Sequence, residues 1–209
     1  MTTTQSTPST KAHTGTATNG VQQHRLDVPA EVRESTATKA LRYVAAATRI
    51  SLGWVFLWAF LDKAFALGFD TGRDSTTGVI SRFGPDAWIH GGSPTAGFLG
   101  FATKGPFADF YQSFAGAGWA DAGFMLALLA IGTALILGIT TRLATVAGVA
   151  LLVMMWSAVL PTANNPFMDD HLIYALTLVL LALMGASKTF GLGRVWERLT
   201  IVQRFSFLK

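Results

Sequence analysis

The sequence of 209 residues contains no cysteine and few charged side chains, only 13% of the total. Without cysteine the chain forms no disulfide, no thiolate metal site and no cysteine-ligated iron–sulfur cluster. Average soluble domains carry about 25% charged residues. The low share here, beside 51% apolar residues and a mean hydropathy of +0.42, argues against an ordinary soluble enzyme, a disordered protein and a nucleic-acid binder. The length fits one domain.

Four long apolar segments dominate the chain. They occupy residues 43–66, 122–141, 143–160 and 171–187. A helix needs about 20 apolar residues to cross about 30 Å of hydrocarbon, and short connections favour antiparallel neighbours. The sequence therefore predicts an all-α fold, an integral membrane four-helix bundle with a long outer segment between the first two helices. The alternative, four buried helices of a soluble protein, is disfavoured, because helices of soluble proteins have one polar and one apolar face.

The two ends of the chain differ from this membrane domain, which we place at residues 43–196. Eight of the first twenty residues are threonine, so residues 1–42 are expected to form a disordered polar tail. Its charged second half is compatible with a short helix on the membrane surface. Residues 197–209 form a basic carboxy-terminal tail.

The distribution of charge predicts the orientation in the membrane. With the amino terminus in the cytoplasm, twelve of the sixteen Lys and Arg residues lie inside, and eight of the twelve acidic residues lie outside. This bias follows the positive-inside rule and places both termini on the cytoplasmic side of the membrane. The excess of basic residues then reflects topology and contact with anionic membrane lipid, and no nucleic acid is expected as a partner.

Small residues at four-residue spacing predict close contacts between helices. Ala130, Ala134 and Gly138 share one face of the second segment, and Ala144 and Gly148 share one face of the third.

Ionisable residues within the first apolar segment are costly in a membrane and are therefore candidates for function. Arg49 lies about one turn inside it, where its side chain could also reach the inner interface. Asp62 and Lys63 lie near the far end. Adjacent helical residues point about 100° apart, so these two are not expected to pair with each other, and each is expected to find a partner on another helix.

A second polar cluster precedes the fourth segment. Asp169 and Asp170 sit where a helix starts, and such positions favour acidic residues by capping and by the helix dipole. His171 and Tyr174 share a helix face, and an imidazole beside carboxylates can transfer protons near neutral pH. We predict an outer pocket built from these four residues together with Asp62 and Lys63. The alternative that Asp169 and Asp170 only cap the helix stays open. A metal site is a weaker alternative, because the spacing of the possible ligands is not diagnostic.

The segment at residues 67–121 is unusually long for a connection. Ser93 followed by Pro94 predicts a capped helix start, and Pro106 predicts a second short helix. Alternating Gly and Phe indicate an amphipathic hairpin at the mouth of the bundle. It would either shield a site from water or form a collar that faces lipid.

Three stretches carry a resemblance to a known family. They are Arg49–Lys63 (RISLGWVFLWAFLDK), Trp88–Phe98 (WIHGGSPTAGF) and Asn164–Tyr174 (NNPFMDDHLIY). They resemble the DoxX/DoxD-like family of bacterial and archaeal membrane proteins over about residues 43–196. The resemblance implies the large membrane subunit of a thiosulfate:quinone oxidoreductase, which works with a small DoxA-type subunit. Other members are linked to redox-defence complexes.

The implied reaction assigns roles to the polar residues. Asp170, His171 and Asp62 would be catalytic, and Lys63, Arg49, Asp169 and Tyr174 would bind the anionic donor or the quinone. The sequence carries no haem, flavin or iron–sulfur motif, so quinone is the expected electron acceptor and no resident metal is assigned. Two other functions stay open. One is a non-catalytic membrane subunit of a respiratory or redox-defence complex, and the other is a small transporter, which has less support because no helix is broken at the midplane.

Overall fold

The structure, a computed structural model, describes Thr2 and residues 35–205. The tail predicted to be disordered lies outside the described residues, apart from Thr2 and residues 35–42. Residues 35–205 contain helices and no β-strand, with one isolated antiparallel bridge between Arg73 and Ile80. The predicted all-α class is therefore confirmed for the described part of the chain.

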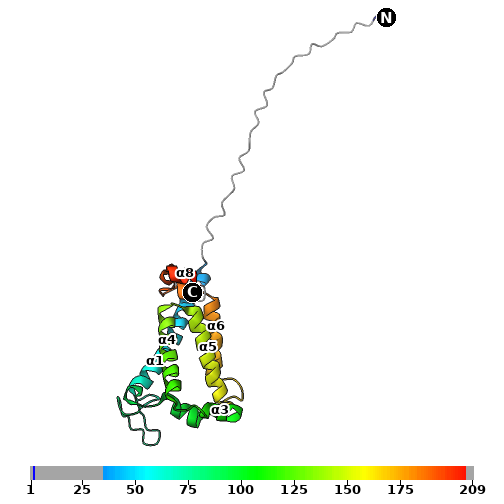
Figure 1. The fold of residues 1–209 in the computed structure, drawn as a ribbon. Coiled ribbons are helices and arrows are strands. Elements are labelled where there is room, and N and C mark those ends of the chain that lie inside the picture. The colour runs from blue at the N-terminus through cyan, green and yellow to red at the C-terminus, as the bar shows by residue number, and fades with distance from the viewer. Residues whose placement is uncertain (1, 3–34, 206–209) are drawn as a thin grey trace. The chain divides into compact units, whose positions relative to one another are not determined.

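Four long helices lie side by side in Figure 1. They are α1 (Thr36–Phe65), α4 (Gly118–Leu137), α5 (Thr141–Ala158) and α6 (Asp170–Leu183). α1, α4 and α5 are long enough and apolar enough to cross a membrane, whereas α6 is apolar but has only 14 residues. The structure thus contains three candidate membrane spans and one shorter apolar helix among its described residues.

Short helices occupy the two ends of the bundle. Between α1 and α4 lie η1 (Trp88–His90), α2 (Pro94–Gly97), the π-helical turn η2 (Phe98–Ala102), η3 (Gly105–Phe107) and α3 (Ala108–Gln112). After α6 come η4 (Ala186–Lys188), α7 (Gly193–Trp196) and α8 (Thr200–Arg204). Figure 1 shows α3 at one end of the bundle and α8 at the other.

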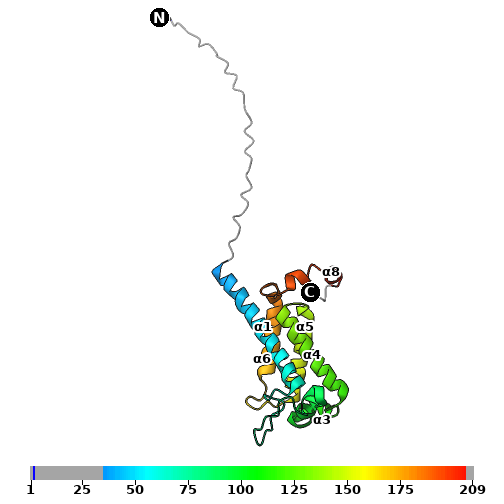
Figure 2. The same ribbon diagram turned by 90° about the vertical axis from the view of Figure 1, so that its left-hand side faces the viewer.

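Local signals explain where the long helices begin and end. α1 starts seven residues before the predicted segment, because the Ser35 side chain caps it by accepting from the Thr38 amide at 3.1 Å. Figure 2 shows this first part of α1 projecting from the bundle. α4 ends when Gly138 adopts a left-handed conformation with φ 70°. α6 stops before the predicted position 187, because Gly185 has φ 63° and the short η4 follows.

The four helices close around one core. α1 packs on α4, α4 on α5, α5 on α6, and α6 returns to α1. Phe56, Leu128, Leu152 and Leu178, one from each helix, are buried in it. The tightest approach joins α1 and α4, where a Cβ on Gly132 would lie 2.7 Å from the Leu57 amide nitrogen. Of the small residues predicted to make close contacts, four are buried (Ala134, Gly138, Ala144 and Gly148), but Ala130 is exposed, and Gly132 makes the contact with α1 instead.

The long connection is built as the sequence predicts at both proline positions. The Ser93 hydroxyl accepts from the Ala96 amide at 3.2 Å and Pro94 occupies the first helical position. Pro106 lies in η3, which leads directly into α3. Nearer α1, the backbone amides of Thr77 and Thr76 donate to Asp74 and hold the pKa of its carboxyl below the usual range.

We expect Gly132→Ala to lower the melting temperature of the detergent-purified protein, since the added methyl meets backbone of α1 and overpacking costs about 1–3 kcal/mol. Gly123→Ala in the same helix is the matched control. Nothing lies within 4 Å of its Cβ position, and replacing a helical glycine by alanine gains up to about 1 kcal/mol. Equal shifts in both variants would show that α1 and α4 do not touch at Gly132.

Candidate functional site

The predicted site residues lie at two ends of the bundle, called here the Arg49 end and the Asp62 end. Thirteen positions separate the two residues on α1, which corresponds to about 20 Å along the helix axis at 1.5 Å per residue. Lys63 and the cluster at the start of α6 belong to the Asp62 end. Arg49 therefore does not share a pocket with the other predicted residues.

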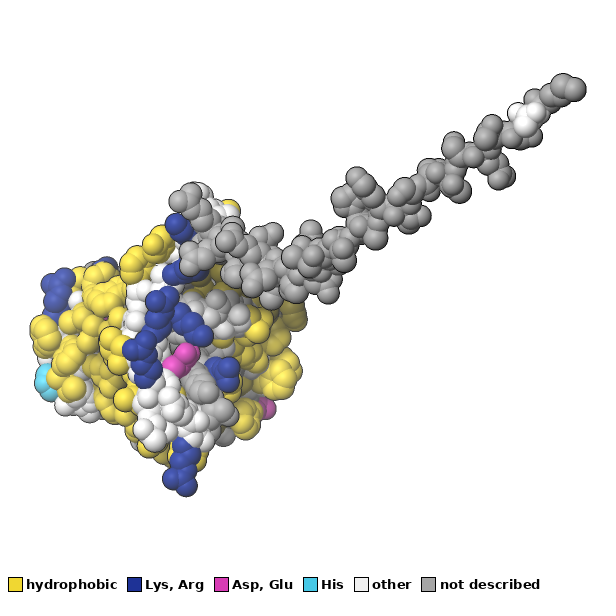
Figure 3. All heavy atoms as spheres, turned by 90° about the horizontal axis from the view of Figure 1, so that it is seen from above, with side chains coloured by type: hydrophobic (Ala, Val, Ile, Leu, Met, Phe, Trp, Pro, Cys, Tyr) yellow, Lys and Arg dark blue, Asp and Glu magenta, His cyan; other side chains and the backbone are white. Residues whose placement is uncertain are grey.

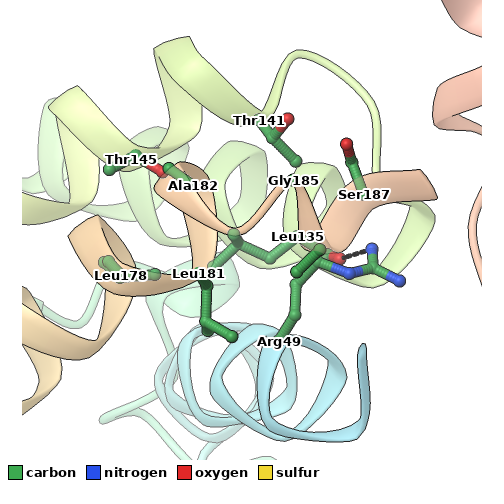
Figure 4. Close-up of a pocket in the computed structure, with 10 residues that line it drawn as sticks. Arg49, Leu135, Thr141, Thr145, Leu178, Leu181, Ala182, Gly185 and Ser187 are labelled. Carbon is green, nitrogen blue, oxygen red and sulfur yellow. Dashed lines mark hydrogen bonds between the residues drawn. The ribbon is translucent and has the colours of Figure 1, made fainter. Parts of the chain in front are cut away.

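Arg49 is buried to 1% exposure and holds the end of α4 (Figure 4). Its Nη1 donates to the carbonyls of Leu135 and Ile136, and its Nη2 donates to Phe190 O at 2.9 Å and to Thr189 O at 3.3 Å. These groups include helix-end carbonyls that have no partner within their own helix. Nε has no hydrogen-bond partner among the described residues.

The space beside Arg49 is small. The adjoining cavity measures about 20 Å³, roughly the room that one water molecule needs. A Cβ on Gly138 would lie 2.6 Å from Nη1, so glycine is required there for the guanidinium to fit. The side chain is enclosed by protein and faces no ligand-sized cavity, and its contacts give it a structural role.

Asp62 is likewise buried, and its carboxylate binds backbone amides of the loop after α1. Its carboxylate accepts from the amides of Phe69 at 3.2 Å, Asp70 at 3.0 Å and Thr71 at 2.8 Å. The loop after α1 is thereby folded back over the helix end. The prediction of a partner on another helix is wrong for Asp62, because the loop that follows brings three of its own amides to the carboxylate.

Lys63 also finds its partner in that loop. Its ammonium lies 2.5 Å from the carboxylate of Asp70, whose side chain is 79% exposed. The expected partner on another helix is again replaced by a local one. Beside the pair lies a groove of about 440 Å³ between Trp54, Trp58 and Phe69, which is open to the surroundings.

The start of α6 combines a cap with an acid–base pair. Asp169 caps α6 by accepting from the Leu172 amide at 3.2 Å, and its other oxygen lies 2.7 Å from His171 Nδ1. Asp170 Oδ1 lies 3.6 Å from the same nitrogen. The imidazole is 21% exposed, and Nε2 has no hydrogen-bond partner among the described residues. Both the capping role and the proton-transfer role predicted for this cluster fit one geometry.

Tyr174 lies one turn further along α6 and packs against the common core. The three side chains at 169–171 offer ligand atoms within 4.8 Å of one another, so a metal is compatible by distance. Within residues 35–205, no hydrogen bond or ion pair joins this cluster to Asp62 or Lys63. The six residues of the predicted outer pocket therefore form two separate polar groups.

Sequence reasoning missed a large apolar cavity at the Asp62 end. It measures about 590 Å³ and lies between α4, α5 and the connecting segment. Gly123 and Ala127 line it from α4, and Ala150 and Met154 line it from α5. The small residues on α4 and α5 were a possible signal for this cavity. Divergence of the two helices cannot be predicted from a local sequence pattern.

We expect Arg49→Met to destabilise the protein strongly, since each buried carbonyl left without a donor costs about 1–3 kcal/mol. Arg194→Met removes an exposed charge at the same end and serves as the control. Thermal unfolding in detergent measures both variants. A melting temperature of Arg49→Met equal to that of the control would contradict the structural role.

Asp62→Asn is expected to loosen the loop after α1, because the amide nitrogen of asparagine cannot accept from backbone N–H groups. Hydrogen exchange should accelerate at Phe69, Asp70 and Thr71. Asp70→Asn removes only the exposed ion pair with Lys63, worth about 0–1 kcal/mol, and should leave exchange at Phe69 slow. Unchanged exchange in Asp62→Asn would show that these amides are protected by something else.

Comparisons with protein-family models, with curated proteins and with solved structures gave no match to this chain. The resemblance to the DoxX/DoxD-like family therefore stays a prediction carried by the three sequence stretches. What the chain does has to be inferred from the geometry of its residues.

Proposed function

We propose that the chain is a DoxX-like integral membrane protein whose four long helices all cross the bilayer of a bacterial plasma membrane. Three helices meet the length and hydropathy required. α6 spans about 21 Å at 1.5 Å per residue, less than about 30 Å of hydrocarbon. It is apolar and packs between α5 and α1, and the turn at 184–188 extends its path, so local thinning of the bilayer accommodates it.

The Arg49 end faces the cytoplasm in this proposal. Exposed basic side chains gather over that end in Figure 3. They come from the start of α1, the start of α5 and the segment after α6: Lys39, Arg42, Arg142, Lys188, Arg194, Arg198 and Arg204. Such an excess follows the positive-inside rule and suits contact with anionic lipid headgroups. The long connection then lies on the outer side.

Within this arrangement we propose a quinone-reactive oxidoreductase subunit that handles protons at His171. The observation that carries the proposal is the 2.7 Å contact between Asp169 Oδ2 and His171 Nδ1. A carboxylate on Nδ1 fixes the ring and its tautomer, and leaves Nε2 to donate a proton to an acceptor and to be reprotonated from the outer side. Asp170, whose side chain is exposed, places a second carboxylate oxygen 3.6 Å from the same ring nitrogen.

The oxidation of thiosulfate, the electron donor, is assigned to a partner protein. Two thiosulfate anions lose one electron each as tetrathionate forms, and the quinone takes up two electrons and two protons. Arg49 is enclosed by carbonyls and Lys63 is paired with Asp70, so neither is free to attract the anion. A small DoxA-like subunit, or another redox protein, is therefore the proposed site of thiosulfate oxidation.

A non-catalytic membrane subunit of a respiratory or redox-defence complex is the second candidate. It is favoured by the use of Arg49, Asp62 and Asp169 as partners for backbone groups. In this case His171 would only complete the cap of α6. The two candidates differ in what the loss of the imidazole does.

We expect His171→Gln to lower thiosulfate-dependent quinone reduction by the natively purified complex about 10²-fold or more, the usual contribution of a general acid or base. The amide of glutamine keeps a donor near Asp169 and so spares the cap. His90→Gln, an exposed histidine in the connecting segment, is the control. Full activity in His171→Gln, or a wild-type complex without activity but with its partners retained, would overturn the enzyme and favour the non-catalytic subunit.

A further inference from the structure

We infer that the apolar cavity between the outer halves of α4 and α5 binds the hydrocarbon chain of a membrane lipid. This inference needs the protein to be in a bilayer, but it does not depend on the proposed reaction at His171. The cavity of about 590 Å³ falls within the range of about 300–1,000 Å³ found for small-molecule sites.

The cavity arises because α4 and α5 diverge. A tight connection at residues 138–140 joins them at the Arg49 end, and midway along α5 Gly148 still approaches Ile131 of α4, with 3.5 Å from its Cβ position to a methyl carbon. Beyond this point the lining includes several small residues, Gly123 and Ala127 on α4 and Ala150 on α5. A Cβ on Gly123 would meet nothing within 4 Å, so this wall does not close on its own.

Aromatic side chains of the connecting segment close the wide end of this wedge. Phe98, Phe110, Tyr111 and Phe114 line it, and neighbouring rings contact one another, with 5.5 Å between the centroids of Phe110 and Phe114. The segment is held in place from both helices. Asp121 of α4 accepts from the Thr95 hydroxyl at 2.6 Å, and Ser157 of α5 lies 2.6 Å from the hydroxyl of Tyr111.

The buried polar side chains along the walls already have partners. Thr95 donates to Asp121 and accepts from the Gly116 amide at 3.1 Å, and Tyr111 bonds Ser157, whose hydroxyl donates to Met154 O at 2.9 Å. The cavity therefore offers no charge and no free buried donor for a headgroup. An apolar cavity stays dry, and an empty one forfeits dispersion contacts, so the chemistry that fits it is a hydrocarbon chain.

The walls are also open towards the lipid side. Trp119 and Phe110, both lining residues, are 70% and 63% exposed, and the exposed Met154 supplies a flexible thioether wall. A chain can therefore enter laterally from the outer leaflet while its headgroup stays at the interface. An acyl chain and an isoprenoid tail share this chemistry, and the experiment below distinguishes them.

The test uses the full chain in vesicles of phosphatidylglycerol and phosphatidylethanolamine that contain a little phospholipid with a photoreactive acyl chain. After illumination, mass spectrometry of peptides locates the label. We expect label to concentrate on the cavity walls of α4, α5 and the connecting segment. Gly123→Phe and Ala127→Phe each fill the space and should abolish it there. Ala130 is exposed on the same face of α4 but lies outside the cavity, so Ala130→Phe should leave this labelling unchanged.

Adding a long-chain isoprenoid alcohol separates the two sources. Loss of label assigns the site to isoprenoid tails, and unchanged label assigns it to acyl chains. A uniform label over lipid-facing residues such as Leu126 and Leu176, without excess at the cavity, would overturn the inference. The same holds if Gly123→Phe and Ala130→Phe label alike while both retain the wild-type melting temperature.

Discussion

The buried ionic groups of this protein serve its backbone, and the arrangement of the helices depends on that. Helix ends leave carbonyls and amides without partners, and a hydrocarbon environment supplies no water for them. Near the middle of α1, at one end of the bundle, the guanidinium of Arg49 binds carbonyls of α4 and of the turn before α7. At the other end the carboxylate of Asp62 binds three amides of the next loop. One helix thus fixes both ends of the bundle.

The same constraint changes how an ionisable residue at membrane depth is interpreted. Such residues are costly and are functional candidates by default, but Arg49, Asp62 and Asp121 have partners that account for their burial without a ligand. His171 differs from them. Its Nδ1 is held by the carboxylate of Asp169, and its other ring nitrogen is left to the surroundings. The proposed chemical role therefore rests on this single pair instead of the wider set that the sequence suggested.

The sequence predicts most of the helices because apolar runs and terminal signals are local. Ser93 with Pro94 correctly predicts the start of α2, whereas the segments predicted to run to 141 and 187 end earlier, at Gly138 and before Gly185. Partners are not local. Asp62 and Lys63 were expected to reach other helices, yet the nearest free amides and the nearest carboxylate lie in the loop that follows them. Gly132 rather than Ala130 faces α1, since rotation of α4 about its axis is set by packing.

The cavity depends on the connecting segment in a way that explains the length of that segment. α4 and α5 are joined tightly at one end only, so their far ends need a third element to hold them apart and to cover the gap. The segment does both, because Thr95 is bonded to Asp121 of α4, while Tyr111 is bonded to Ser157 of α5. The Lys104 amide also donates to Ala158 O at 3.1 Å, at the end of α5. The loop that continues from there to Asp169 is held by the Trp156 indole, which donates to Phe167 O at 2.7 Å. The walls of the cavity and the cap that carries His171 are therefore parts of one connected framework at the Asp62 end.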